Sequence, residues 1–232
     1  MDFGKAFTFM GDDPDWVSKL AIGALVVLIT PFLLGIPVIL LVGYQIAMAR
    51  QVMRGETDRL PAWDNIGQLF MDGLNVVIAL LVYSAPAWIL LCIGFAAFAL
   101  PAFSGGDEEL AGALAGIGFG IYALMLCLVI LFALVLGIVA PGIYIQYVRT
   151  GELGALFRFG EVLDIVRDNL GDVVLAWLAY FVANLLLQLV TAISIITICG
   201  PIILGLVGPV WLLIVAGHLY GQIGAKAGYS PA

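Results

Sequence analysis

The chain has 232 residues, of which 63% are hydrophobic and 11% are charged, and its formal net charge is −7. A soluble domain carries about 25% charged and about 45–50% apolar residues. This composition excludes a water-soluble globular protein and predicts an all-α integral membrane protein whose main partner is the lipid bilayer. We expect no nucleic-acid partner, because the nine Lys and Arg residues are spread along the chain and not clustered on one face.

Long uncharged runs set the expected number of membrane-spanning helices. The four longest are Leu20–Ala49, Gly73–Gly106, Leu110–Val148 and Val173–Ala225. A helix needs roughly 20 apolar residues to cross the hydrocarbon core, so each of the first three runs holds at least one span. The fourth is long enough for two, with a break at Cys199-Gly200-Pro201. We predict five or six hydrophobic helical segments in a single membrane domain over residues 1–232.

The first uncharged run is interrupted in its middle. Thr30-Pro31 and Gly35-Ile36-Pro37 lie there, and proline removes a backbone donor and clashes with the preceding turn. We therefore predict two arms, Trp16–Thr30 and Pro37–Met53, which form a tight or re-entrant hairpin and leave the N-terminus in the cytoplasm. The alternative is a single kinked helix.

Arginine is distributed unevenly between the loops, and loops rich in Lys and Arg stay in the cytoplasm. Arg50–Asp72 and Arg149–Asp172 both contain several arginines, whereas Pro101–Glu109 contains only acidic charges. This pattern predicts a multi-pass protein with loops 50–72 and 149–172 and the C-terminus in the cytoplasm, and with loop 101–109 outside.

Two stretches in the arginine-rich loops have the spacing of amphipathic helices. In Gly154–Leu170 the apolar residues recur on one helical face, at Leu156, Phe159, Leu163, Val166 and Leu170. Trp63–Met71 repeats this pattern over a shorter length. Both predict helices at the membrane interface with their apolar faces towards lipid. The alternative is a docking surface for a cytoplasmic partner, with candidate contacts at Arg54, Trp63, Asp64, Arg158, Phe159 and Arg167.

The two arginine-rich loops also resemble each other. Gly55-Glu56 matches Gly151-Glu152, and Asp72 matches Asp168 at the same offset. This similarity predicts a parallel internal repeat, with one unit at residues 20–100, a second at residues 116–198 and a final span at residues 202–225. Parallel repeats occur in transporters, but they also arise where a two-span hairpin is simply duplicated.

A few polar residues fall inside the predicted spans, and none of them is Asp, Glu, Lys or Arg, which argues against proton coupling through charged groups. Asn184, Gln188 and Thr191 recur at i, i+4 and i+7, and His218 lies one turn before Gln222. We expect these side chains to form hydrogen bonds between helices. The alternative is that they line a polar groove for a lipid headgroup or a solute. His218 has a further alternative, which is to ligate a haem or a pigment.

Glycines recur at every fourth position in two spans, at Gly112, Gly116 and Gly120 and at Gly217 and Gly221. Small residues at this spacing let helices approach closely, and we expect packing within the chain, with dimerisation as the alternative. The sequence contains no nucleophile, metal-binding or phosphate-loop motif of the common kinds. We therefore expect a protein that is not an enzyme, with no catalytic residues, no metal site and no cofactor.

One string of residues carries a family resemblance. It consists of Gly43-Tyr44, Arg54-Gly55-Glu56, Leu60-Pro61-Ala62-Trp63-Asp64 and Asp72-Gly73-Leu74. The string resembles the hallmark of the bacterial and archaeal family known as domain of unknown function 4013, and Ala216–Gln222 is similar to the last span of that family. The resemblance runs from about Phe3 to Gln222. It implies an integral protein of a prokaryotic plasma (inner) membrane, and it implies no activity, substrate or catalytic residue.

Three functional hypotheses follow from these observations. The leading one is a scaffold or accessory subunit of a membrane assembly, with another membrane protein as its partner. The second is a transporter or lipid-handling protein with a groove between parallel repeats. The third is a pigment- or haem-binding subunit that uses His218.

Overall fold

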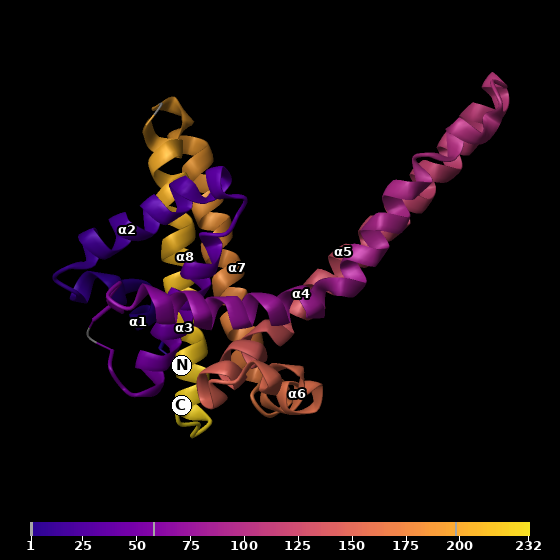
Figure 1. Ribbon diagram of the computed structural model, residues 1–232. Helices are drawn as coiled ribbons and strands as arrows, with labels where there is room; N and C mark the ends of the chain where they lie inside the picture. The colour runs from indigo at the N-terminus through magenta and orange to yellow at the C-terminus, as the bar shows by residue number, and fades with distance from the viewer. Residues whose placement is uncertain (1, 58, 198) are drawn as a thin grey trace. The chain divides into compact units, whose positions relative to one another are not determined.

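The computed structural model describes residues 2–57, 59–197 and 199–232. Its α-helices, drawn in Figure 1, are α1 (Phe3–Thr8), α2 (Trp16–Ile29), α3 (Val38–Met53), α4 (Ile66–Ala97), α5 (Glu108–Thr150), α6 (Phe159–Asp168), α7 (Leu170–Ile193) and α8 (Cys199–Lys226). Short 3₁₀ helices cover Phe9–Asp12, Thr30–Leu33, Leu100–Ser104, Leu153–Phe157 and Ser194–Ile196. The described residues include no strand, and the predicted all-helical fold is confirmed.

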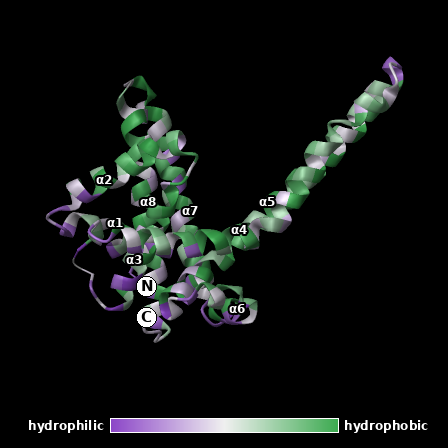
Figure 2. Ribbon diagram, in the orientation of Figure 1, coloured by the Kyte–Doolittle hydropathy of each residue, from purple (hydrophilic) through white to green (hydrophobic). Residues whose placement is uncertain are grey.

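Five helical segments are long and apolar enough to cross a membrane: Trp16–Leu33, Ile66–Ser104, Glu108–Thr150, Leu170–Ile196 and Cys199–Lys226. Hydrophobic residues cover most of α4, α5, α7 and α8, as Figure 2 shows. Large apolar side chains on these helices are exposed, among them Ile89, Leu131 and Leu186, as expected for surfaces that contact lipid. The chain is therefore a multi-pass helical membrane protein.

The N-terminal apolar run forms two separate helices, α2 and α3, and not one kinked helix. A 3₁₀ turn follows α2, after which Leu34 and Gly35 take positive φ angles of 52° and 82°. The loop after α3 folds back onto the start of α2, where Lys19 Nζ donates to Leu60 O at 2.8 Å. The helical hairpin is present, and the number of membrane crossings that it makes stays a prediction.

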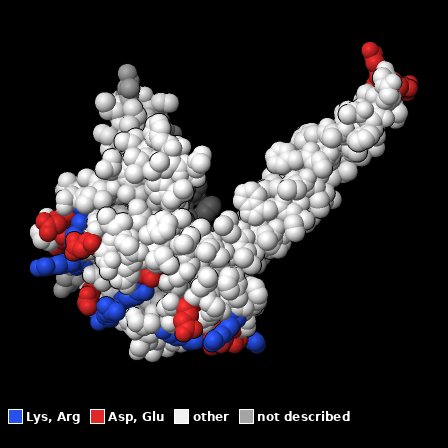
Figure 3. All heavy atoms as spheres, viewed as in Figure 1, with Lys and Arg blue, Asp and Glu red and all other residues white. Residues whose placement is uncertain are grey.

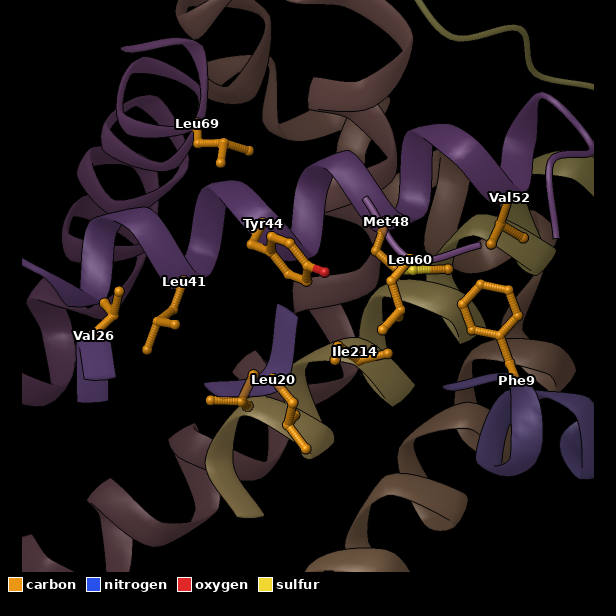
Figure 4. Close-up of a cluster of buried hydrophobic side chains, with 11 residues drawn as sticks. Phe9, Leu20, Val26, Leu41, Tyr44, Met48, Val52, Leu60, Leu69 and Ile214 are labelled. Carbon is orange, nitrogen blue, oxygen red and sulfur yellow. The ribbon is translucent and has the colours of Figure 1, made fainter. Parts of the chain in front are cut away.

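The helices form two compact units, Met1–Ala79 with Val139–Ala232, and Leu80–Ile138. In the first unit, α8 packs against α2, α3 and α7. Figure 4 shows the buried apolar cluster of this unit, which consists of Phe9, Leu20, Val26, Leu41, Tyr44, Met48, Val52, Leu60, Leu69, Val210 and Ile214. The N-terminal segment and the loop after α3 thus close over the contact between α3 and α8.

Glycines on one face of α8 bring this helix close to α3. A Cβ added to Gly217 would lie 2.7 Å from Gln45 O, and a Cβ added to Gly221 would lie 2.7 Å from Ala49 O. Both glycines therefore lie at a contact between two helices of the same chain.

In the second unit, the contact between α4 and α5 uses a different glycine from those that the sequence suggests. A Cβ added to Gly118 would come closer than 3.0 Å to Ala97 O. One turn further along α5, the ring of Tyr122 lies 4.8 Å from that of Phe98. By contrast, a Cβ added at Gly112, Gly116 or Gly120 would meet nothing within 4 Å among the described residues. Helix α5 thus turns the face of Gly118 towards α4 and leaves the predicted stripe without a helix against it.

Helix α6 has apolar residues that are buried within the unit and others that are exposed. Val162, outside the predicted apolar face, and Val166, within it, are buried, whereas Phe159 and Leu163 of that face are 50% and 52% exposed. The cause is Gly142 of α5, whose missing side chain leaves room for the backbone of Val162: an added Cβ would lie 2.7 Å from Val162 O. Helix α6 therefore has two apolar faces, one packed within the unit and one exposed.

The shorter predicted amphipathic helix is not a separate element. Helix α4 begins at Ile66 and continues without interruption to Ala97. Polar residues at its start form an N-terminal cap, in which Asn65 Oδ1 accepts a hydrogen bond from Gln68 N at 3.2 Å. The stretch therefore starts the long helix, and Trp63 lies in the loop before it.

Candidate functional site

The polar stripe of α7 lines a cavity of about 510 Å³. The cavity lies between α7, α8 and the α2–α3 hairpin, and its polar lining residues are Thr30, Tyr180, Asn184, Gln188 and Thr191. The spacing i, i+4, i+7 places the last three on one face of α7. Apolar residues form most of the remaining wall, among them Val27, Leu41, Leu187 and Leu212.

The two amides in this cavity have no hydrogen-bond partner among the described residues. Asn184 is half-buried and Gln188 is exposed, and neither side chain bonds to another described group. Thr191 Oγ1 donates to Leu187 O within α7 at 2.8 Å. In the described part of the chain, the stripe thus makes no hydrogen bond between helices. Each amide keeps two N–H donors and one carbonyl acceptor for another group.

No Asp, Glu, Lys or Arg lies among the residues that line the cavity. The charged residues of the first unit gather at the end that carries α1, α6 and the C-terminus, as Figure 3 shows. The cavity lies away from that end, beside Thr30 at the tip of the α2–α3 hairpin. An uncharged polar group suits these surroundings, because a charged group would be desolvated there without a counter-charge.

His218 and Gln222 do not belong to this cavity. The ring of His218 is 1% exposed and lies 5.0 Å from the ring of Phe9. Its Nδ1 is 2.9 Å from Gln222 Nε2, and Gln222 also bonds to the backbone of Asp2. The structure therefore places His218 and Gln222 apart from the cavity that the α7 stripe lines, because α8 borders this cavity with residues between Leu204 and Leu213, closer to its N-terminal end.

The loop after α3 is fixed by the N-terminal segment. The carboxylate of Asp13 is 1% exposed and accepts hydrogen bonds from Lys19 Nζ and from Leu60 N, both at 2.7 Å. The ring of Trp63 stacks on that of Tyr44 at 4.3 Å, and its Nε1 donates to Lys19 O at 3.0 Å. Trp63 therefore anchors the loop within the unit and is only partly available as a contact for another protein.

The other predicted contact residues are exposed: Arg54, Asp64, Arg158, Phe159 and Arg167. They lie in two separate places, since the first two follow α3 and the others belong to the α6 region. Sequence reasoning did not identify the role of Asp13. No short-range pattern signals it, because its partner Leu60 is distant in the chain.

Asp13 is expected to make the stability of the fold depend on pH. Burial raises the pKa of its carboxyl group, but the hydrogen bonds from Lys19, Asp15 N and Leu60 N and the charge of Lys19 outweigh burial, so the pKa lies below its ordinary value of 3.8. A carboxyl group with a lowered pKa stabilises the folded state above its unfolded pKa, and this contribution is lost as the pH falls through the folded pKa. We expect Asp13→Asn to lower the free energy of unfolding by about 2 kcal/mol at neutral pH.

Unfolding in SDS, followed by circular dichroism at several pH values, measures this effect. The difference between Asp13→Asn and the unsubstituted protein should shrink as the pH falls below about 4. Asp12→Asn is the matched control, because Asp12 is an exposed carboxylate next to Asp13. An equal loss of unfolding free energy in the two variants would contradict a specific role for Asp13.

The separated parts of the family-like string contact one another in the fold. Tyr44 Oη donates to Pro61 O at 2.9 Å, beside the stacked ring of Trp63. No curated protein and no solved structure matches the chain. The family described as Protein of unknown function (DUF4013) matches residues 22–197, which is more than half of the chain. The chain belongs to this family.

Proposed function

We propose that this chain is a non-enzymatic lipid-handling protein, which holds a lipid-like amphiphile with an uncharged polar headgroup in the cavity between α7, α8 and the α2–α3 hairpin. The observation that supports this proposal is the pair of unpartnered amides, Asn184 and Gln188, in a cavity with otherwise mainly apolar walls. A transporter for an uncharged polar solute would use the same two amides.

The cost of leaving these amides unpaired favours a ligand that satisfies them. An amide without a hydrogen bond in an apolar environment costs about 2 kcal/mol or more, and the hydrocarbon core offers no water to bond with it. A headgroup with hydroxyl, carbonyl or amide groups would pair with both side chains. An anionic or cationic headgroup would find no opposite charge on the cavity wall.

The size of the cavity and its surroundings fit an amphiphile. Its volume of about 510 Å³ lies within the range of about 300–1,000 Å³ that is usual for small-molecule sites. The outward face of α7 is apolar, with Leu185 and Leu189 53% and 56% exposed. The acyl chains of the ligand would lie along such apolar surfaces, with only the headgroup and upper chain inside the cavity.

Placement in the membrane is part of the proposal. The exposed face of α6, with Phe159 and Leu163 about half exposed, and Leu170 at the start of α7 would lie at headgroup depth on the cytoplasmic side of a prokaryotic plasma membrane. The arginine-rich loops would share that side. A parallel repeat is supported by Gly55 and Gly151, which follow α3 and α5 with positive φ angles of 80° and 67°.

Native mass spectrometry of the protein released from mild detergent tests the proposal. We expect the unsubstituted protein to retain one defined uncharged amphiphile or solute, and we expect Asn184→Ala with Gln188→Ala to lose most of it. Leu185→Ala with Leu189→Ala is the matched control, since the same helix is truncated twice on its outward face, outside the cavity lining.

Retention of the same molecule by both double variants would overturn the proposal. Isolation of the chain without any amphiphile or solute, but with a second protein at a fixed ratio, would also overturn the proposal. That outcome would favour the alternative role as a scaffold or accessory subunit, for which Arg54, Asp64 and the exposed face of α6 would be the first contacts to change.

A further inference from the structure

A second cavity, of about 460 Å³, lies at the charged end of the first unit and is independent of the proposed lipid site. It is framed by the last turns of α3, the Pro61–Asn65 loop and the first turns of α4, with Gly151 and Ala232 at its edge. Its polar side chains are Arg50, Gln51, Arg54, Asn65, Gln68 and Asp72. Two arginines thus share one small cavity in a chain whose net charge is −7.

Both oxygens of the single side-chain carboxylate on the wall already accept hydrogen bonds. Asp72 Oδ2 accepts a hydrogen bond from Arg50 Nη1 at 2.9 Å, and Asp72 Oδ1 accepts one from Tyr147 Oη at 2.9 Å. Arg54 forms no ion pair with any described residue. The side chains that line the cavity therefore carry one more positive charge than negative charge, and no described carboxylate lies within ion-pair distance of Arg54.

The donors that remain free point to an anion. The described hydrogen bonds of Arg50 use one nitrogen of its guanidinium group, and its Nε is buried without a partner. Gln68 Oε1 accepts from Asn65 Nδ2 at 3.1 Å, so the free end of the Gln68 amide is its N–H₂ group, a donor. The available donors are thus two guanidinium groups and the amide of Gln68, set around a space large enough for a tetrahedral oxyanion. Gln51 Oε1 is a buried acceptor without a described partner, and it would pair with a hydroxyl of the ligand.

We propose that this cavity binds a phosphate group, either on a lipid headgroup or on a water-soluble phosphorylated compound. Arginine pairs with phosphate oxygens through parallel N–H···O bonds, and Arg54 is exposed and can move towards the ligand. Arg50 is held in place by Asp72, so it is a positioned donor that loses little freedom on binding. Gln68 would bond a third oxygen.

Isothermal titration calorimetry of the full chain in an uncharged maltoside detergent tests this site. One arm uses inorganic phosphate, and the other uses the short-chain lipid dihexanoylphosphatidylglycerol. We expect at least one probe to bind, and we expect Arg54→Gln to weaken its binding about tenfold, as the loss of a charge-assisted hydrogen bond implies. Arg59→Gln is the matched control, since it removes the same charge from the same loop, outside the cavity lining, and it should change the affinity less than about twofold.

The two arms separate the sources of the phosphate. Binding of both probes, or of phosphate alone, identifies a soluble compound as a ligand, whereas binding of the lipid alone identifies a headgroup. Gln68→Leu should weaken the binding of the same probe. Asn184→Ala with Gln188→Ala should leave its affinity unchanged, because these amides line the other cavity. The proposal would be overturned if Arg54→Gln and Arg59→Gln lost the same amount of binding affinity, or if neither probe bound.

Discussion

Replacement of Gly43 by alanine is expected to prevent α3 and α4 from packing and to abolish most of the folded protein. A Cβ added to Gly43 would come closer than 3.0 Å to Leu69 O and to the carbonyl carbon of Leu69, and a Cβ added to Gly73 would meet Ile39 O in the same way. The clash is with backbone on both sides, so no side chain can move to relieve it. Overpacking of this kind costs about 3 kcal/mol or more.

The folded fraction after extraction, measured by size-exclusion chromatography and by unfolding in SDS, reports this loss. Gly112→Ala is the matched control, because it adds the same methyl group to a helix where nothing described lies within 4 Å. Alanine also favours the helix over glycine by about 1 kcal/mol, so this control should fold at least as well as the unsubstituted protein. Similar folded fractions for Gly43→Ala and Gly112→Ala would show that α3 and α4 do not cross at these glycines.

Asp72→Leu is the second substitution from which we expect a large effect. Asp72 and Arg50 are paired at 2.9 Å, and their side chains are only 11% and 13% exposed. Removal of the carboxylate leaves a guanidinium group that stays charged in proteins, and it also leaves Tyr147 Oη without its acceptor. Breaking a buried ion pair in this way costs about 3–5 kcal/mol, which SDS unfolding measures directly.

A double-mutant cycle shows whether the loss comes from the unpaired charge. Arg50→Leu together with Asp72→Leu removes both partners, so it should be more stable than Asp72→Leu alone. If the double variant instead loses as much stability as the two single variants together, the two side chains act independently. That result would contradict the ion pair as the link between α3 and α4.

The helices and the break in the first apolar run were predictable because they depend on local sequence. Uncharged runs long enough to cross a bilayer form helices, because the hydrocarbon core offers the backbone N–H and C=O groups no other hydrogen-bond partners. Pro31 and Pro37 interrupt the first of these runs. The amide stripe was predictable in part, since spacing alone places Asn184 and Gln188 on one face of a helix. Spacing does not say whether that face meets another helix or a cavity, and here it lines a cavity.

The features that the sequence did not predict have the same cause, which is that spacing does not show what a helical face contacts. Periodicity in α6 identifies the exposed apolar residues Phe159 and Leu163, but it does not identify Val162, which is buried because Gly142 of α5 leaves room for it. The spacing of Gly112, Gly116 and Gly120 is suitable for packing, yet Gly118 meets α4. His218 falls outside the cavity because its place along α8, relative to the tip of the hairpin, depends on tertiary structure. In each case a long-range contact decides what a local pattern leaves open.

Photo-crosslinking from inside the cavity tests the proposed lipid-handling role most directly. A diazirine amino acid would replace Leu187, which lines the cavity, or Leu186, its neighbour on the exposed face of α7. After illumination in native membranes, mass spectrometry of the adducts should find one defined amphiphile with an uncharged polar headgroup at position 187, and a mixture of bulk lipids at position 186. The same mixture at both positions would contradict the proposal, because the cavity would then hold no ligand of its own.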